Sequence, residues 1–452
     1  MANGGNVNTR KQNCDCGIFA QDSWTMDRLT VNGGVRFDWF NNSIPGGTRP
    51  ASYFAPAITF ADVKNVPDWK NWNGRFGGAD DLFGDGQTAV KASVGRYVAN
   101  EAIGFTDPFN LGSPTGQIDY RLWTDLNKDG TVLNKDGTPQ LNEIAASFNP
   151  NFGKPTPSNH LDPDLQRGKN WEYSAGVERQ LMAGWSVSGS WYRRRYYDFT
   201  MVDNRNISAA ADYVPRTFTA PLDARLPNGG GETFTIYQLR PGLTSILGGN
   251  NLYTQAPTDW RTWNGFEVIA NGNLWRGGFM TASWTAGKSK QSLCDSAKLD
   301  SPNGLRFCDR QTPYRHQAKL SGAVPLPFDT MISGLFQIFQ GNQVGATYQV
   351  GANDLGGPLN LSGGTLNVQL IEPGTRFYDA TTDLQLRFSK TFTMSSRVKS
   401  NVYINTSNIF NKAAITGRNE FFGGNRVIGN EYQRPVTVQQ GRAMSFGVRT
   451  DF

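Results

Sequence analysis

The chain has 452 residues, among them 51 Gly and 23 Pro, only 2 His and 4 Cys, and a net charge of +6. Gly and Pro scattered this widely disfavour a mainly helical protein, and no stretch reaches the roughly 18 apolar residues that a membrane-spanning helix needs. The small basic excess is spread along the chain, whereas nucleic-acid-binding domains usually gather basic residues on one face.

Alternation of apolar and polar residues with a period of two is the strongest pattern. Residues 29–39 begin it: Leu29, Val31, Val35, Phe37 and Trp39 share one parity, and Thr30, Asn32, Arg36 and Asp38 share the other. Such a segment predicts a strand with one apolar and one polar face. The same pattern recurs in residues 171–177, 185–191, 383–389, 398–405 and 444–452.

About fourteen to sixteen segments of this kind follow one another, and their connections alternate in length. Residues 182–184 and 275–277 form short connections, whereas long polar loops are expected at about 99–168, 200–231 and 289–312. A soluble sandwich prefers short connections throughout. Outer-membrane barrels instead have short periplasmic turns and long extracellular loops. The sequence therefore predicts an all-β fold, an antiparallel transmembrane β-barrel with long extracellular loops.

Aromatic residues and the C-terminus support a membrane barrel. Trp24, Trp39, Trp171, Trp185 and Trp275 are placed near expected strand ends, where aromatic belts meet the membrane surfaces. Aromatic core residues of a soluble β-rich binding protein are the alternative. The last strand contains Phe446 and ends in Phe452. This ending resembles the C-terminal signal of bacterial outer-membrane barrels and implies contact with the barrel assembly machinery.

Several segments resemble one family. The run NVYINTSNIFNK (401–412) followed by GRAMSFGVRTDF (441–452) resembles the last strands of TonB-dependent outer-membrane receptors. The segments at 17–38, 65–97 and 170–194 are similar to the Oar-like receptors, which carry a carboxypeptidase-regulatory-like domain. The resemblance covers residues 17–452, with residues 1–16 expected to form a non-barrel N-terminal segment.

The resemblance implies a location in the outer membrane and a transport function. A complete receptor of this type has an export signal, a plug and a barrel of about 22 strands, so this chain is expected to be a fragment, the C-terminal portion of the barrel. Its implied partners are outer-membrane lipid, an unidentified large and scarce solute, and a TonB-type energising complex that acts through the plug; no nucleic acid is expected. A surface-display or adhesion protein anchored by its barrel is the alternative.

One loop carries a calcium-binding pattern. Asp125, Asn127, Asp129 and Thr131 have the D-x-N-x-D-G spacing of the first half of an EF-hand loop, and Asp136 stands at position twelve. Their oxygens are ligands that Ca²⁺ prefers. Position twelve is Asp rather than Glu, and no flanking helices are evident. A polar loop built on Asx turns is the alternative, and no other cofactor is expected.

The cysteines fall into two pairs. Cys294 and Cys308 flank a loop, and an exported protein is expected to join them as a disulfide. Cys14 and Cys16 lie too close in sequence to bridge comfortably, so one of them is expected to have its partner elsewhere.

The run Trp191-Tyr192-Arg193-Arg194-Arg195-Tyr196-Tyr197 mixes aromatic and basic residues. It is interpreted as an interfacial belt with arginines near lipid phosphates, in preference to a surface that stacks nucleic-acid bases. Neither His160 nor His316 neighbours a nucleophile motif. The chain is therefore not expected to be an enzyme, and no catalytic residue is predicted.

Overall fold

The computed structural model describes residues 10–110, 120–147, 152, 158–243, 250–395, 397–424, 427–429 and 431–451. Within them, the largest sheet has 14 strands. Thirteen of these strands follow one another in chain order, each antiparallel to the next. They are β1 (Lys11–Met26), β2 (Leu29–Ser43), β5 (Asp68–Asp81), β6 (Thr88–Val98), β8 (Lys169–Met182), β9 (Trp185–Tyr197), β14 (Trp260–Leu274), β15 (Gly278–Ser292), β17 (Arg315–Leu326), β18 (Thr330–Phe339), β21 (Thr381–Thr393), β22 (Lys399–Ser407) and β27 (Ala443–Asp451).

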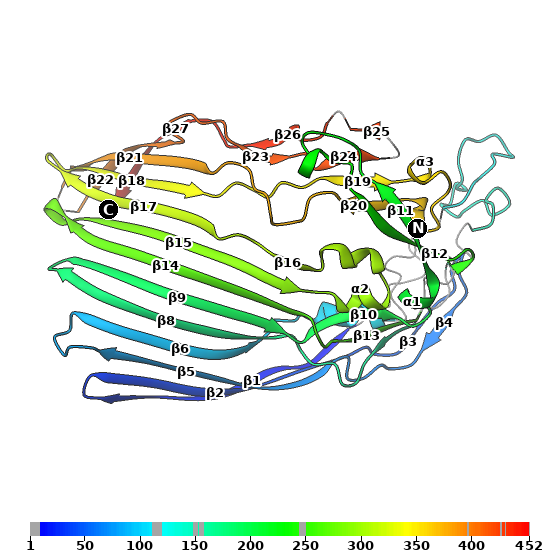
Figure 1. Ribbon diagram of the computed structural model, residues 1–452, viewed down its shortest axis with the longest axis horizontal. Coiled ribbons are helices and arrows are strands. Elements are labelled where there is room, and N and C mark those ends of the chain that lie inside the picture. The colour runs from blue at the N-terminus through cyan, green and yellow to red at the C-terminus, as the bar shows by residue number, and fades with distance from the viewer. Residues whose placement is uncertain are drawn as a thin grey trace.

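Short turns gather at one end of this sheet and long loops at the other, as Figure 1 shows at its left and right sides. The turn from β8 to β9 is residues 183–184, and the turn from β14 to β15 is η4 (Trp275–Gly277). The long loops are residues 44–67, 99–168, 198–259, 293–314, 340–380 and 408–442. The 198–259 loop is longer than the expected 200–231, because β11 and β12 belong to it, and the 293–314 loop begins after the expected residue 289, because β15 continues to Ser292.

The strand register separates a polar face of the sheet from an apolar face. Arg36 of β2 pairs with Asn73 of β5, whereas its neighbour Phe37 pairs with Trp72. Successive strand residues point to opposite faces, so the alternation in the sequence becomes two chemically different surfaces. The apolar face leaves large side chains exposed, including Ile18, Trp24, Val35, Trp72, Phe76, Val177, Val268, Trp284, Phe388, Val402 and Phe446.

Strand β1 begins inside the segment expected to lie outside the barrel. Residues 11–16 pair with β2, with a bulge between Gln12 and Cys14. This part of the strand is held by backbone hydrogen bonds and lacks apolar alternation, so its sequence gives no strand signal. Cys14 and Cys16 are joined by a disulfide, with their Cα atoms 5.4 Å apart. The expectation of separate partners was wrong, because residues i and i+2 of a strand lie on the same face.

The loops contain small sheets and short helices, and none of the helices in the described residues is long and apolar enough to cross a membrane. The small sheets pair β3 with β4, β7 and β10 with β13, β11 with β12, β19 with β20 and β24, β24 with β25, and β23 with β26, and β16 pairs with β15. The bounds are β3 (Gly47–Arg49), β4 (Ile58–Phe60), η1 (Ile103–Phe109), β7 (Ser158–Leu161), β10 (Phe199–Asn204), α1 (Ala209–Asp212), β11 (Tyr213–Thr219), η2 (Pro227–Gly229), β12 (Thr233–Leu239), β13 (Asn250–Ala256), α2 (Asp295–Leu299), η5 (Pro302–Phe307), β16 (Asp309–Gln311), β19 (Thr347–Val350), α3 (Ala352–Leu355), η6 (Ser362–Gly364), β20 (Leu366–Gln369), β23 (Ile415–Arg418), β24 (Phe421–Gly424), β25 (Val427–Ile428) and β26 (Pro435–Val438).

Three of the long loops share one buried apolar cluster, which we call the loop core. Phe218 comes from the 198–259 loop, Tyr348 from the 340–380 loop, and Phe422 and Tyr432 from the 408–442 loop. The Phe218 and Tyr348 rings stack with their centroids 5.2 Å apart, and Phe422 meets Tyr432 edge-on at 4.8 Å. These loops therefore fold against one another at the end of the sheet.

A disulfide closes the 293–314 loop. Cys294 and Cys308 are bonded, with their Cα atoms 5.0 Å apart, as expected from the sequence. The Leu293 N–H donates to the Cys308 carbonyl at 2.9 Å, so the backbone also holds the two ends of the loop together.

Candidate functional site

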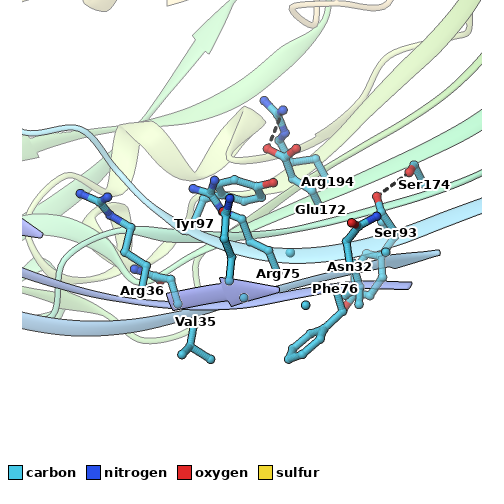
Figure 2. A pocket seen from close by; sticks show the side chains of 18 of the residues that line it. Asn32, Val35, Arg36, Arg75, Phe76, Ser93, Tyr97, Glu172, Ser174 and Arg194 are labelled. Carbon is cyan, nitrogen blue, oxygen red and sulfur yellow. Dashed lines mark hydrogen bonds and ion pairs between the residues drawn. The ribbon is translucent and has the colours of Figure 1, made fainter. Parts of the chain in front are cut away.

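The polar face of the sheet carries a cavity of about 1320 Å³, lined by residues of β1, β2, β5, β6, β8, β9, β14 and β15. Figure 2 shows Arg36, Arg75, Tyr97 and Arg194 on one side of the strands, whereas Val35 and Phe76 point to the opposite side. The strand pleat therefore gathers the polar side chains of distant sequence segments on one wall.

Arg36 of β2 is held by its neighbours on this wall. Its Nε donates to Asp38 Oδ1 at 2.6 Å, and Asn73 Nδ2 of β5 donates to Asp38 Oδ2 at 2.8 Å. Residues 36 and 38 share a face because they are two apart in a strand. The contacts fix the guanidinium side chain in place while leaving it partly exposed to the cavity.

Arg75 contacts an aromatic ring and does not pair with a carboxylate among the described residues. Its guanidinium carbon is 4.4 Å from the centroid of the Tyr97 ring on β6. Arg261 of β14 likewise bonds a neutral group, with its Nε 3.1 Å from Gln291 Oε1. Among the described residues neither arginine forms an ion pair, so both keep a positive charge available to a ligand.

Arg194 of β9 forms the centre of a third group. Its Nη2 is 2.6 Å from Glu172 Oε1 of β8, and its Nη1 donates to the Tyr196 hydroxyl at 3.1 Å. The aromatic and basic run at 191–197 is thus divided by the pleat. Arg193 and Arg195 lie on the apolar face, in keeping with an interfacial belt, but Tyr192, Arg194 and Tyr196 lie on the polar face, so that interpretation was wrong for these three.

This wall offers hydrogen-bond donors for an anionic ligand. The lining contains Arg36, Arg75, Arg194 and Arg261 on the polar face, and its acidic members are Asp22 and Glu172. Guanidinium groups bind carboxylates and phosphates through paired N–H donors, and Tyr97 and Tyr196 add aromatic surface. The alternation in the sequence predicts that Arg36 and Arg75 lie on a polar face. Only the strand register shows that they share a cavity with Arg194 and Arg261.

The residues of the expected calcium loop divide into two groups. Asp125, Asn127, Asp129 and Thr131 lie in one hydrogen-bonded turn. Asp136 instead accepts bonds from the Thr138 N–H and hydroxyl, at 3.0 and 2.7 Å. Across the part of the chain that the structure describes, no group of three or more His, Cys, Asp and Glu side chains is positioned to hold a metal ion.

The expected C-terminal signal is described only in part. Phe446 lies on the apolar face of β27, where 72% of its surface is exposed. Phe452 lies outside the described residues. The assignment of both residues to the barrel assembly machinery stays a prediction.

Asp162 connects two of the long loops. Its carboxylate accepts a hydrogen bond from Thr254 Oγ1 at 2.5 Å and from the Asp164 N–H at 2.9 Å. The bond from Thr254, followed by the one from Asp164, lowers the pKa of Asp162 below its usual 3.8. A carboxyl group with a lowered pKa stabilises the folded state above the unfolded pKa, and this contribution is lost as the pH falls through the folded pKa.

We therefore expect Asp162→Asn to lower the melting temperature of the protein at neutral pH. The difference from the wild type should begin to shrink below pH 3.8 and vanish once the pH is under the folded pKa. Thermal unfolding of both proteins across this range measures the difference. A difference that stays constant into acid would show that the ionised carboxylate does not stabilise the loop junction.

Comparisons with known proteins place this architecture in a family. The model of the outer membrane beta barrel domain family matches residues 2–439. No curated protein gives a significant match by sequence.

Similar solved structures include the outer membrane transporter YddB from Escherichia coli, with 9% identity, a TM-score of 0.49, and coverage of 96% of this chain and 53% of YddB. They also include the copper transporter OprC (14% identity, TM-score 0.45, 96% and 47% coverage) and the FrpB iron transporter from Neisseria meningitidis (13%, 0.44, 96% and 44%). The chain spans about half the length of these proteins.

The family model extends over nearly the whole chain. The same chain forms a sheet with an exposed apolar face and with short turns at one end and long loops at the other. The protein therefore belongs to the outer membrane beta-barrel domain family and lies in the outer membrane.

Proposed function

We propose that the chain is the barrel portion of a TonB-dependent outer-membrane receptor, of the Oar-like group, that admits a large, scarce and anionic solute. The polar wall would form part of the barrel lumen, and a plug belonging to the complete protein would close it until a TonB-type complex supplies energy. The long loops would face the cell exterior, since barrels of this kind place short turns in the periplasm.

The arginine-lined cavity is the observation that supports this proposal most. A barrel that only anchors loops needs an apolar outer face, but it has no need of ligand-accessible charge within. Arg75 and Arg261 have no acidic partner among the described residues and line the same cavity. Their charges would attract an anionic solute from the loop end towards the lumen.

A surface-display or adhesion protein is the second candidate. The loop core supports it, because three loops packed through Phe218, Tyr348 and Phe422 form a defined surface that a partner could recognise. Transport and display differ in whether the protein needs energy from the inner membrane.

The test compares solute depletion from the medium by bacteria that carry the whole receptor. The variant Arg75→Gln with Arg261→Gln removes two charges without leaving an acidic partner unpaired. We expect the wild type to deplete an anionic solute, and the double variant, a gene deletion and a strain without the energising complex all to deplete it much more slowly. Arg276→Gln, in the short turn at 275–277, is the matched control and should behave as the wild type.

Two results would contradict transport. One is equal depletion of every solute by the wild type and the gene deletion. The other is depletion that continues unchanged without the energising complex. Display would be favoured if the gene deletion depletes solutes as the wild type does but the deleted cells no longer attach to surfaces.

A further inference from the structure

A buried carboxylate without a cation lies at the turn formed by residues 125–131. Glu143 is only 3% exposed. Its Oε1 accepts the N–H groups of Leu126 and Asn127, at 2.9 and 3.1 Å, so the side chain is directed into the turn. Its Oε2 is buried and has no hydrogen-bond partner among the described residues, and no ion pair involves Glu143 there. A buried charge of this kind is normally paired with a cation or bound to a metal.

Several side-chain oxygens of the turn accept hydrogen bonds from its own backbone. Asp125 accepts the N–H groups of Asp129 and Gly130, both at 3.1 Å, and Asn127 Oδ1 also accepts the Asp129 N–H, at 2.9 Å. Gly130 has a φ of +73°, which a residue with a Cβ adopts at a cost. Asp129 Oδ1 accepts the Thr131 N–H at 2.9 Å. The backbone is thereby wrapped around its own side-chain oxygens.

Further oxygens converge on one side-chain amide. Gln140 Nε2 is 2.8 Å from Asp129 Oδ2, 3.3 Å from the Thr131 carbonyl and 3.2 Å from the Leu133 carbonyl. A cation in place of this amide nitrogen would interact with all three oxygens at full charge. Its electrostatic attraction to them would therefore be stronger than that of the amide. Gln140 is itself buried, so water does not compete freely there.

We propose that residues 125–143 bind Ca²⁺, with Glu143 rather than Asp136 as the closing acidic ligand. Asp125, Asn127, Asp129 and the Thr131 carbonyl supply the other oxygens. Asp136 is committed to the Thr138 turn, whereas Glu143 already contacts the N–H groups of Leu126 and Asn127. No three acidic side chains of the described residues are grouped around one point in this structure. The Gln140 amide lies among the oxygens that would bind the ion, so binding requires this amide to rotate away.

The ligand chemistry selects Ca²⁺ over Mg²⁺. The site offers carboxylate, amide and carbonyl oxygens, which Ca²⁺ accepts in irregular geometry, whereas Mg²⁺ needs a near-octahedral set of short bonds and dehydrates reluctantly. Extracellular calcium modules typically bind with Kd values of about 10⁻⁴ to 10⁻³ M. The inference concerns the 99–168 loop alone and does not depend on solute transport.

Terbium luminescence tests the proposal on the whole protein in detergent micelles. Trp123 pairs with Ile144, next to Glu143, so its indole can sensitise a bound Tb³⁺. We expect a saturable terbium signal that Ca²⁺ displaces and Mg²⁺ does not at equal concentration. Glu143→Gln keeps an oxygen for the Leu126 and Asn127 N–H groups, so the turn should persist, but its affinity for Ca²⁺ should fall at least about tenfold.

Asp136→Asn is the matched control and should bind Ca²⁺ as the wild type does. Asp129→Asn should weaken binding in the same way as Glu143→Gln, which separates ligand loss from an effect peculiar to residue 143. A wild-type protein without a displaceable terbium signal would overturn the proposal. So would an unchanged affinity in Glu143→Gln, or a loss that appears in Asp136→Asn instead.

Discussion

Arginine in place of Val268 is expected to destabilise the protein in a phospholipid bilayer by about 2–4 kcal/mol. Val268 lies near the middle of β14 on the apolar face, where it pairs with Trp284 of β15 and is 40% exposed. In the outer membrane this exposed surface meets lipid chains. A charged group placed there loses its hydration and finds no partner in the hydrocarbon.

Ile269→Arg provides the matched control, one residue along the same strand. Ile269 lies on the polar face, between Ser188 of β9 and Ser283 of β15. An arginine there remains in contact with a polar wall, so we expect a much smaller change in the free energy of unfolding. Denaturant unfolding of the whole protein in vesicles measures both. Equal costs for the two substitutions would contradict the assignment of the faces.

Phe422→Ala is expected to remove about 3–5 kcal/mol from the stability of the loop core. Phe422 is 0% exposed and packs against Tyr432 and Tyr348, with the Arg225 guanidinium 5.7 Å from its ring centroid. Truncation would leave a cavity among the buried apolar side chains that the three loops contribute. The membrane strands should remain folded, because the loop core lies outside them.

Hydrogen exchange can localise this effect. In Phe422→Ala, amides of β11, β19 and β24 should exchange faster together, while those of β14 and β15 remain protected. Phe421→Ala removes the same side chain from the neighbouring position, which is 46% exposed, and should leave exchange close to that of the wild type. Faster exchange confined to β24 would show that the three loops do not form one cooperative unit.

Much of the sheet was predictable from local sequence. Alternation around Leu29–Trp39 specifies which residues share a face, and a two-residue turn such as 183–184 fixes the partner of the next strand. Antiparallel neighbours joined by short turns need no long-range information. The fold class followed from these signals, whereas the total of 22 strands and the fragment status stay predictions.

The candidate sites depended on contacts that sequence spacing does not reveal. Arg75 and Arg261 are far apart in the chain and meet one cavity only through the order of the strands. Glu143 lies outside the twelve-residue pattern that singled out Asp136, so sequence spacing alone does not select it as a candidate ligand. The loop core is similarly hidden, because the strands β14, β15, β17 and β18 of the large sheet lie between Phe218 and Tyr348 in the chain.

The loop core has a consequence for immunological work on this protein. A synthetic peptide that copies only residues 408–442 would present Phe422 and Tyr432 to water without the side chains from the other two loops that cover them. Antibodies raised against such a peptide would recognise conformations that the folded protein does not present. An immunogen for this protein should therefore present the 198–259, 340–380 and 408–442 loops together, on strands that hold them in place.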